Sequence, residues 1–341
     1  MNTHARTILT KLSIQEVGQG LMDLDFSREP IELQENDETS RIASFFLKGF
    51  NMEAAYQFSG MENPDSSQLK ELIEDYFHHK FEFHKLSEEI AREWVRLQPT
   101  PSFPGELIVC QFSEINETAE NCPGIGIFLV RSKEKFLQIN RIGARVSVKI
   151  EEGINLKKLL ECVLILHSSE NSPATVFFKL NAHEFSENFF IHQFIKALPV
   201  QNNYFNTSYH LNMLKAYVDE TMTEEAPLEK IDKLNRSKEY FTNHEHFNHK
   251  EYESALFEDP DHITSFEKFR NQYAKDNEIP LVDEFEISPH AVKKNFHRIR
   301  SVIKLDKNFH IYVHGNPQNI IRGYDPEKGK HFYQLFFDEE S

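Results

Sequence analysis

The sequence is poor in cysteine, glycine and tryptophan, and it has no long apolar run. Its 341 residues include three cysteines, twelve glycines and one tryptophan. Cys110, Cys122 and Cys162 are odd in number, far apart and without a C-x-x-C pair, which favours buried thiols in a reducing compartment over a disulfide framework or a zinc site. No window approaches the roughly 20 apolar residues of a membrane span, and the first residues lack a secretory-signal pattern. We therefore expect a cytoplasmic protein that does not contact a membrane.

The common catalytic signatures are also missing. The chain contains no G-x-x-x-x-G-K-[ST] loop, no G-x-S-x-G elbow and no H-E-x-x-H motif. Gly124 and Gly126 form a G-x-G without the third glycine of a dinucleotide site. Cys110 lies inside the apolar run ELIVCQF, where core packing is favoured over a role as nucleophile. We expect no catalytic residues, no cofactor and no enzymatic activity.

One histidine-rich segment, NHEHFNHKEYE, needs separate attention. His244, His246 and His249 could meet one metal ion if the backbone bends suitably, with Glu245 as a further ligand. The favoured alternative is an exposed polar loop between helices, in a chain with 17 histidines. We therefore expect no metal site, and a metal-dependent nuclease is the least favoured function.

The apolar patterns predict an α+β fold with a largely antiparallel sheet in the N-terminal half. Alternation predicts an early strand over 7–18, and helical spacing predicts helices over 38–50 and 87–97. Six short apolar runs follow without helices between them, which favours antiparallel pairing: GELIVCQF, GIGIFLVRS, KFLQINRI, ARVSVKIE, ECVLILHS and TVFFKL.

The second half is expected to be helical and acidic, and then rich in strands. Residues 206–278 carry helical stripes, with a capping box predicted at Thr264 and Glu267. A short helical pattern then leads into the strands RSVIKLD, FHIYVHG, NIIRGYD and KHFYQLFF, in which His310, His314 and His331 are expected on sheet faces. We predict three domains: an α+β domain over 1–200, an acidic helical region over 201–283 and a small basic β-rich unit over 284–341.

The charge is uneven along the chain. The net charge is −16, which by itself disfavours binding to a polyanion. The segment from Arg131 to Lys149, however, contains six lysines or arginines and one acidic residue. The segment from Pro289 to Tyr333 contains nine lysines or arginines and three acidic residues. The remaining chain holds 23 basic and 50 acidic residues. A basic face can act locally because charges are screened over about 8 Å at physiological salt.

The two basic segments are the candidate DNA-binding sites. Several cations at separate points suit contact with phosphates, and aromatic residues interleave those of the tail. The alternative is a solvated face that pairs with the acidic helices of the same chain. The candidate residues are Arg131, Lys133, Lys135, Arg141, Arg145, Lys293, Lys294, Arg298, Arg300, Lys304, Arg322, Lys328 and Lys330.

Several stretches together resemble a known family. These are GELIVCQF with GIGIFLVRSKEKFLQI, KKLLECVLILHSSENSPATVFFKL, FFIHQFIKALPVQNNYFNTSYHLNMLKAYVDE and the tail NFHIYVHGNPQNIIRGYDPEKGKHFYQLFF. In this order they are similar to the bacterial nucleoid-associated proteins of the NdpA/YejK-like family. The resemblance implies a non-enzymatic role at the nucleoid and supplies no site residues.

We therefore expect a nucleoid-associated protein that binds double-stranded DNA mainly through phosphates. The alternative is an interaction subunit that uses its acidic helices to reach a DNA-processing enzyme or a nucleic-acid defence complex. DNA-processing proteins are possible partners, and a homodimer is the expected oligomer on symmetry grounds.

Overall fold

The computed structural model divides the chain into two compact units, Met1–Val200 and Gln201–Ser341. The predicted boundary at 283/284, inside the second unit, stays a prediction. The structure describes residues 7–17, 25–27, 29–59, 68–97, 105–115, 121–131, 133–155, 159, 161–167, 173–180, 188–222, 227–296, 302–313, 317–337 and 339.

The first unit is built on a nine-stranded sheet with the order β11-β4-β10-β9-β6-β5-β1-β2, and β3 also pairs with β1. Every pairing in it is antiparallel, so the predicted α+β class and antiparallel sheet are confirmed. The strands are β1 (Ile8–Val17), β2 (Asp25–Phe26), β3 (Ile31–Glu32), β4 (Tyr56–Phe58), β5 (Gly105–Ile115), β6 (Cys122–Val130), β9 (Cys162–Leu166), β10 (Thr175–Lys179) and β11 (Ala197–Pro199).

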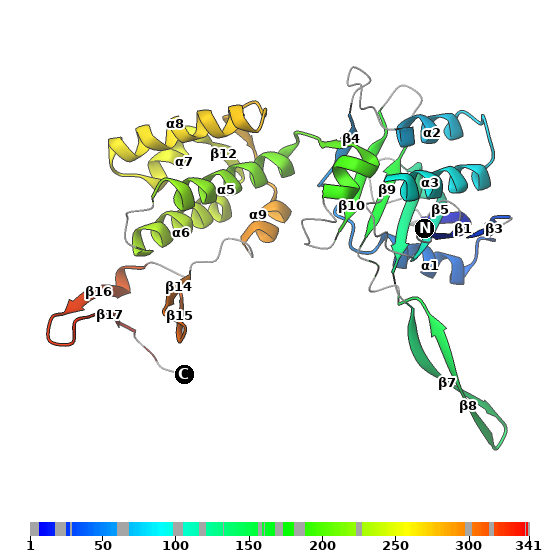
Figure 1. Cartoon of the computed structure of the whole chain (residues 1–341). Coiled ribbons are helices and arrows are strands. Elements are labelled where there is room, and N and C mark those ends of the chain that lie inside the picture. Colours follow the sequence, from blue (N-terminus) through cyan, green and yellow to red (C-terminus); the bar gives the residue numbers. More distant parts are fainter. Residues whose placement is uncertain are drawn as a thin grey trace, which may run out of the picture. The chain divides into compact units, whose positions relative to one another are not determined.

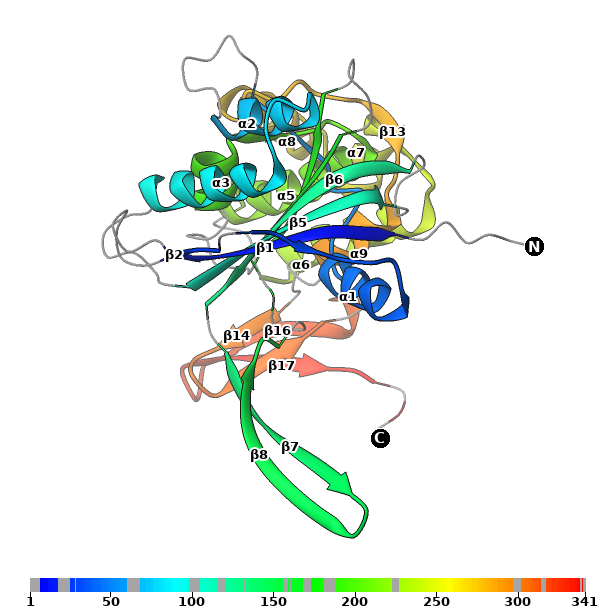
Figure 2. The same cartoon turned by 90° about the vertical axis from the view of Figure 1, so that its right-hand side faces the viewer.

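Helices cover both faces of this sheet (Figure 2). Along β5, Leu107 and Val109 enter the cluster shared with α2 (Gln68–Phe77), α3 (Phe83–Leu97) and the π-helix η3 (Asn188–Ile195). Their neighbours Ile108 and Cys110 enter the opposite cluster, shared with α1 (Asp37–Leu47). Successive side chains of a strand point to opposite faces of the sheet. Since helices cover both faces, the side chains on both faces of β5 are buried. This explains why the strands are almost continuously apolar.

Helix α3 packs against the sheet through apolar residues at helical spacing, as its sequence pattern predicts. Leu86, Ile90 and Trp94 are buried on one side of the helix. The Trp94 ring lies 4.9 Å from Phe189 and 5.1 Å from Phe194, between ring centroids. The helix begins at Phe83, four residues before the predicted start.

A two-stranded arm interrupts the sheet sequence between β6 and β9. It consists of β7 (Glu134–Ile142) and β8 (Arg145–Gly153), which pair only with each other in the part of the chain that the structure describes. The arm projects from the sheet (Figure 1). Both strands were predicted, but as members of one antiparallel sheet with the other four runs. That expectation is wrong for β7 and β8.

The second unit has a helical core. Helices α5 (Asn203–Glu220), α6 (Pro227–Asn243), α7 (His249–Leu256), α8 (Pro260–Asp276) and α9 (Pro289–Phe296) surround the short strands β12 (His246–Asn248) and β13 (Glu284–Glu286). The capping box at Thr264 and Glu267 is wrong: α8 starts after Asp259, whose side chain accepts a hydrogen bond from the Asp261 backbone. Pro260 suits the first helical position because its missing N–H needs no partner there.

Two hairpins end the chain, as predicted. β14 (Val302–Leu305) pairs with β15 (Phe309–Tyr312), and β16 (Ile320–Asp325) pairs with β17 (Lys330–Leu335). A small cluster of Ile303, Val313 and Ile231 joins them to α6. His310 and His331 lie on strands, and His314 lies outside the described residues.

Candidate nucleic-acid interface

The arm formed by β7 and β8 has two chemically different faces. Its register pairs Leu137 with Ile150 and Ile139 with Val148, so these four side chains share one face. Val146 belongs to the same face because it lies opposite Arg141. The other face is mainly polar and carries Gln138, Asn140, Ser147, Lys149 and Arg145, together with Phe136, Glu151 and Ile142.

The apolar face is open to solvent. The exposed fractions of Leu137, Ile139, Val146, Val148 and Ile150 lie between 55% and 68%. Single exposed apolar residues are ordinary, but a contiguous apolar patch on one element marks a surface for association. A two-stranded ribbon is also marginally stable by itself in water, so this face gains from being covered.

The cations at the base of the arm are paired with carboxylates. Arg131 binds Glu161 through two hydrogen bonds, of which the Nη2–Oε1 bond is 2.9 Å long. The Lys133 ammonium lies 2.7 Å from Glu106. Further out, Lys135 lies 3.6 Å from Glu152, and Lys149 lies 2.6 Å from Glu151. These pairs cancel much of the positive charge counted along the sequence.

The cations at the tip differ. Arg141 and Arg145 are exposed, and neither makes an ion pair with any residue that the structure describes. Ile142 and Arg145 flank the two-residue turn Gly143–Ala144, and Arg141 directly precedes Ile142. Gly143 has a φ of +60°, which glycine adopts without strain. Ile142, beside Arg141, is 82% exposed. The tip therefore presents the exposed side chain of Ile142 next to two arginines that have no ion-pair partner among the described residues.

The C-terminal candidates lie in the second unit. Lys293 and Lys294 are exposed in the last turn of α9, and the Lys294 ammonium lies 5.9 Å from the centre of the Tyr204 ring. Arg298 and Arg300 lie outside the described residues. The other candidates of this segment are exposed on the terminal hairpins: Lys304, Arg322, Lys328 and Lys330.

On the last hairpin, basic and aromatic side chains share a face. The register places Arg322 opposite Tyr333 and Tyr324 opposite His331, and all four point to the same side. Lys328 is partly neutralised by Asp325 at 3.5 Å. The two basic segments belong to different units.

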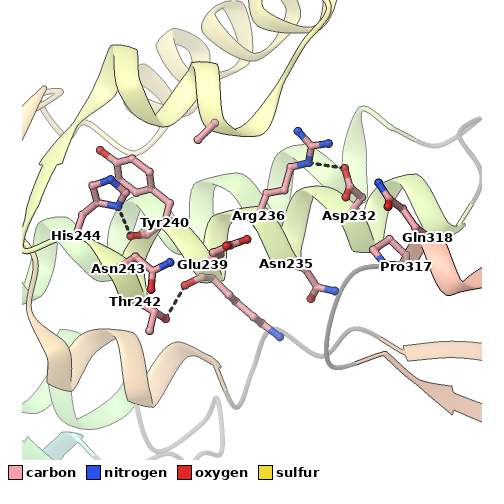
Figure 3. A pocket seen from close by; sticks show the side chains of 12 residues that line it. Asp232, Asn235, Arg236, Glu239, Tyr240, Thr242, Asn243, His244, Pro317 and Gln318 are labelled. Carbon is pink, nitrogen blue, oxygen red and sulfur yellow. Dashed lines mark hydrogen bonds and ion pairs between the residues drawn. The ribbon is translucent and has the colours of Figure 1, made fainter. Parts of the chain in front are cut away.

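A polar groove of about 830 Å³ lies along α6 (Figure 3). Asp232, Arg236, Lys238 and Glu239 line it, so its two cations and two carboxylates leave no net charge. Arg236 is held by Asp232 at 2.9 Å. A groove with this balance does not favour a polyanion.

The histidine-rich segment does not converge on one point. His244 borders the groove, stacks on Tyr240 with 4.2 Å between ring centroids, and bonds through Nδ1 to the Tyr240 carbonyl at 2.9 Å (Figure 3). His246 is exposed on β12. His249 is buried at the start of α7, so the expectation of an exposed loop is wrong for this residue.

Instead, His249 belongs to a buried polar cluster. It lies beside Glu253, one turn further along α7, and both residues are 5% exposed. Burial lowers the pKa of His249 to about 4 and raises the pKa of Glu253 to about 7. His249 is therefore neutral at pH 7. The sequence interpretation missed this cluster, although the spacing of His249 and Glu253 places them on one helix face.

The three thiols are buried, as expected. Burial raises the pKa of Cys110 well above its usual value and that of Cys162 to about 12. Thiols in this state are poor nucleophiles because the reactive species is the thiolate.

Comparison with known families bears directly on the role of this chain. The model of the family "Nucleoid-associated protein YejK" matches residues 8–330. The chain belongs to this family. The suspected resemblance is thus confirmed, and with it a nucleoid-associated role. No curated protein matches the chain. Among the described residues, no helix of this YejK-family protein is both long and apolar enough to cross a membrane.

Proposed function

We propose that this protein is a non-enzymatic nucleoid component that binds duplex DNA mainly through phosphates, and that the tip of the β7–β8 arm is its principal contact. The observation that carries the proposal is the contrast along the arm. The cations at its base are neutralised by Glu161 and Glu106, whereas Arg141 and Arg145 at its tip have no ion-pair partner among the described residues.

The length of the arm explains how an acidic protein can approach DNA. At about 3.3 Å per residue, its nine-residue strands carry the tip about 30 Å from the base. This is more than three times the screening length of about 8 Å at physiological salt. The negative charge of the body of the first unit is therefore largely screened at the tip, while Arg141 and Arg145 act at short range.

The shape of the arm also suits a DNA groove. A two-stranded ribbon fits the major groove, which is about 12 Å wide. The polar face offers Gln138, Asn140 and Ser147 as hydrogen-bonding groups. Amide and hydroxyl groups bind phosphates and base edges alike. In the second unit, Lys293, Lys294 and the Arg322 face are proposed as additional phosphate contacts.

The test is a salt titration of binding to random duplex DNA, followed by fluorescence anisotropy. The double variant Arg141→Glu/Arg145→Glu is expected to lose at least tenfold in affinity at low salt. Its plot of log affinity against log salt should flatten by about two units, because each phosphate contact contributes about 0.9.

The matched control is Lys80→Glu/Lys85→Glu, which changes the net charge equally at exposed positions of the same unit. An equal loss in this control, or wild-type binding without salt dependence, contradicts the proposal. Supercoiled plasmid should stay intact with Mg²⁺ or Mn²⁺, and nicking would contradict the non-enzymatic part. Failure to bind DNA together with capture of a DNA-processing protein from nuclease-treated lysate would favour the acidic helices as a docking surface.

We also propose that the apolar face of the arm pairs with the same face on a second copy of the chain. On this face Lys135 and Glu152 neutralise each other, and only Arg141 adds charge at the outer end. The natural complement of such a face is another apolar face. A two-fold axis supplies one, since the same patch then serves both subunits. The pairing is proposed for Leu137, Ile139, Val148 and Ile150, so Arg141 at the outer end of this face stays available to DNA. Arg145 points away from this face.

A further inference from the structure

The buried cluster around His249 contains polar atoms without hydrogen-bond partners. Both ring nitrogens of His249 and the Oε1 atom of Glu253 lack one, and both side chains are more than nine-tenths buried. Buried polar groups are almost always hydrogen-bonded, so three neighbouring buried atoms without a partner need a physical explanation. A bound ligand is one such cause.

The distances suit a small cation. The Nε2 atom of His249 and the Oε1 atom of Glu253 are 3.0 Å apart but are not oriented as a hydrogen bond. Two ligands that each lie about 2.0–2.2 Å from one ion are typically about 3.0–3.6 Å apart. Glu267 on α8 completes the set, since one ligand atom from each of the three residues lies within 4.8 Å of the others.

Charge and access agree with this arrangement. Arg270 is the cation of the cluster, and it is engaged by Asp283. With Asp283 engaged by Arg270, the carboxyl groups of Glu253 and Glu267 remain beside His249, and a divalent cation bound there would favour their ionised forms. Glu267 is exposed, so an ion can enter from solvent on its side.

We propose that His249, Glu253 and Glu267 bind a divalent transition-metal ion of the Zn²⁺ class. One imidazole and two carboxylates are ligands that Zn²⁺ accepts, and three protein ligands leave its fourth position to water. The ion links α7 to α8 and stabilises the helical unit. It takes no part in DNA contact, so this inference stands independently of the proposed function.

The experiment is calorimetric titration of Zn²⁺ into the full chain after treatment with a chelator and its removal. We expect one tight site per chain and a rise in the melting temperature when Zn²⁺ is added. Glu267→Gln is the decisive variant, because an exposed side chain can change without disturbing the core. It should bind Zn²⁺ at least tenfold more weakly and show a smaller rise in melting temperature.

Two matched controls separate this site from adventitious binding by the other histidines. His246→Ala removes a neighbouring exposed imidazole, and Glu251→Gln removes an exposed carboxylate from the same helix. Both should bind Zn²⁺ as the unchanged chain does. The proposal is overturned if no stoichiometric site is found, if Glu267→Gln binds like the unchanged chain, or if either control loses the site.

Discussion

Ile142 and Arg145 lie opposite each other across the turn that ends the β7–β8 arm, and Ile142 is the more conspicuous of the two because 82% of it is exposed. Its side chain lies on the mainly polar face of the arm. In the major groove an apolar side chain can contact the methyl group of thymine, and this contact does not depend on charge.

Ile142→Ser is therefore expected to weaken DNA binding without changing its salt dependence. The free energy of unfolding should change by less than about 0.5 kcal/mol, as for other exposed substitutions. Anisotropy titrations at several salt concentrations and a denaturant melt measure both. A changed salt slope would show that the substitution disturbed the arginines, and unchanged affinity would exclude Ile142 from the interface.

Lys293 and Lys294 test the contribution of the second unit. Lys293→Glu/Lys294→Glu should lower DNA affinity and reduce the salt slope by about one to two units, because both ammonium groups are exposed at the end of α9. Lys268→Glu/Lys275→Glu, at exposed positions on α8, is the control with the same change in charge. If both variants bind equally well, the C-terminal segment is not part of the interface.

Val148 and Ser147 are neighbours on opposite faces of the arm, and they separate self-association from DNA binding. Val148→Glu places a charge on the apolar face and should shift the protein toward monomer in sedimentation velocity. Ser147→Glu adds the same charge to the polar face and should leave the oligomeric state unchanged while weakening DNA binding. A chain that sediments as a monomer before any substitution would exclude the proposed pairing.

Glu161 and Arg131 form an ion pair that is expected to stabilise the first unit and not to bind DNA. The Glu161 side chain is 8% exposed and receives two hydrogen bonds from the guanidinium. Glu161→Ala leaves Arg131 without this acceptor and should lower the free energy of unfolding by about 1–3 kcal/mol. Denaturant unfolding measures this change. DNA affinity at a temperature where the variant is folded should stay the same, and a large loss would return Arg131 to the interface.

The cysteines predict a pH-dependent reactivity. Burial raises the pKa of Cys162 to about 12 and that of Cys110 well above its usual value, so the thiolate fraction of both stays negligible at neutral pH and grows only in strongly alkaline solution. An alkylating reagent should leave the native protein unlabelled at about pH 8, and all three thiols should react after denaturation. Rapid labelling of the native chain would contradict the burial of these residues.

Much of the fold follows from the sequence pattern. The runs ELIVCQF and GIGIFLV predict strands because β-branched and aromatic residues recur within short turn-bounded segments, and the absence of helices between them predicts antiparallel pairing. Leu86, Ile90 and Trp94 recur every four residues, and this helical spacing of apolar side chains predicts α3. The first residue of a helix is harder to predict. Thr264 is a residue type that often caps a helix, but it lies inside α8.

The candidate site was only partly predictable. The sequence alone located the positive charge between Arg131 and Lys149 and in the tail, and it identified the buried thiols and the apolar strands, because these properties depend on composition and local periodicity. Only the tertiary structure decided that KFLQINRI leaves the sheet, that Arg131 is paired while Arg141 and Arg145 are not, and that His249 meets Glu267. Alternation looks the same in a packed strand and in a projecting arm, and a charge is neutralised by residues that are near in space but distant in sequence.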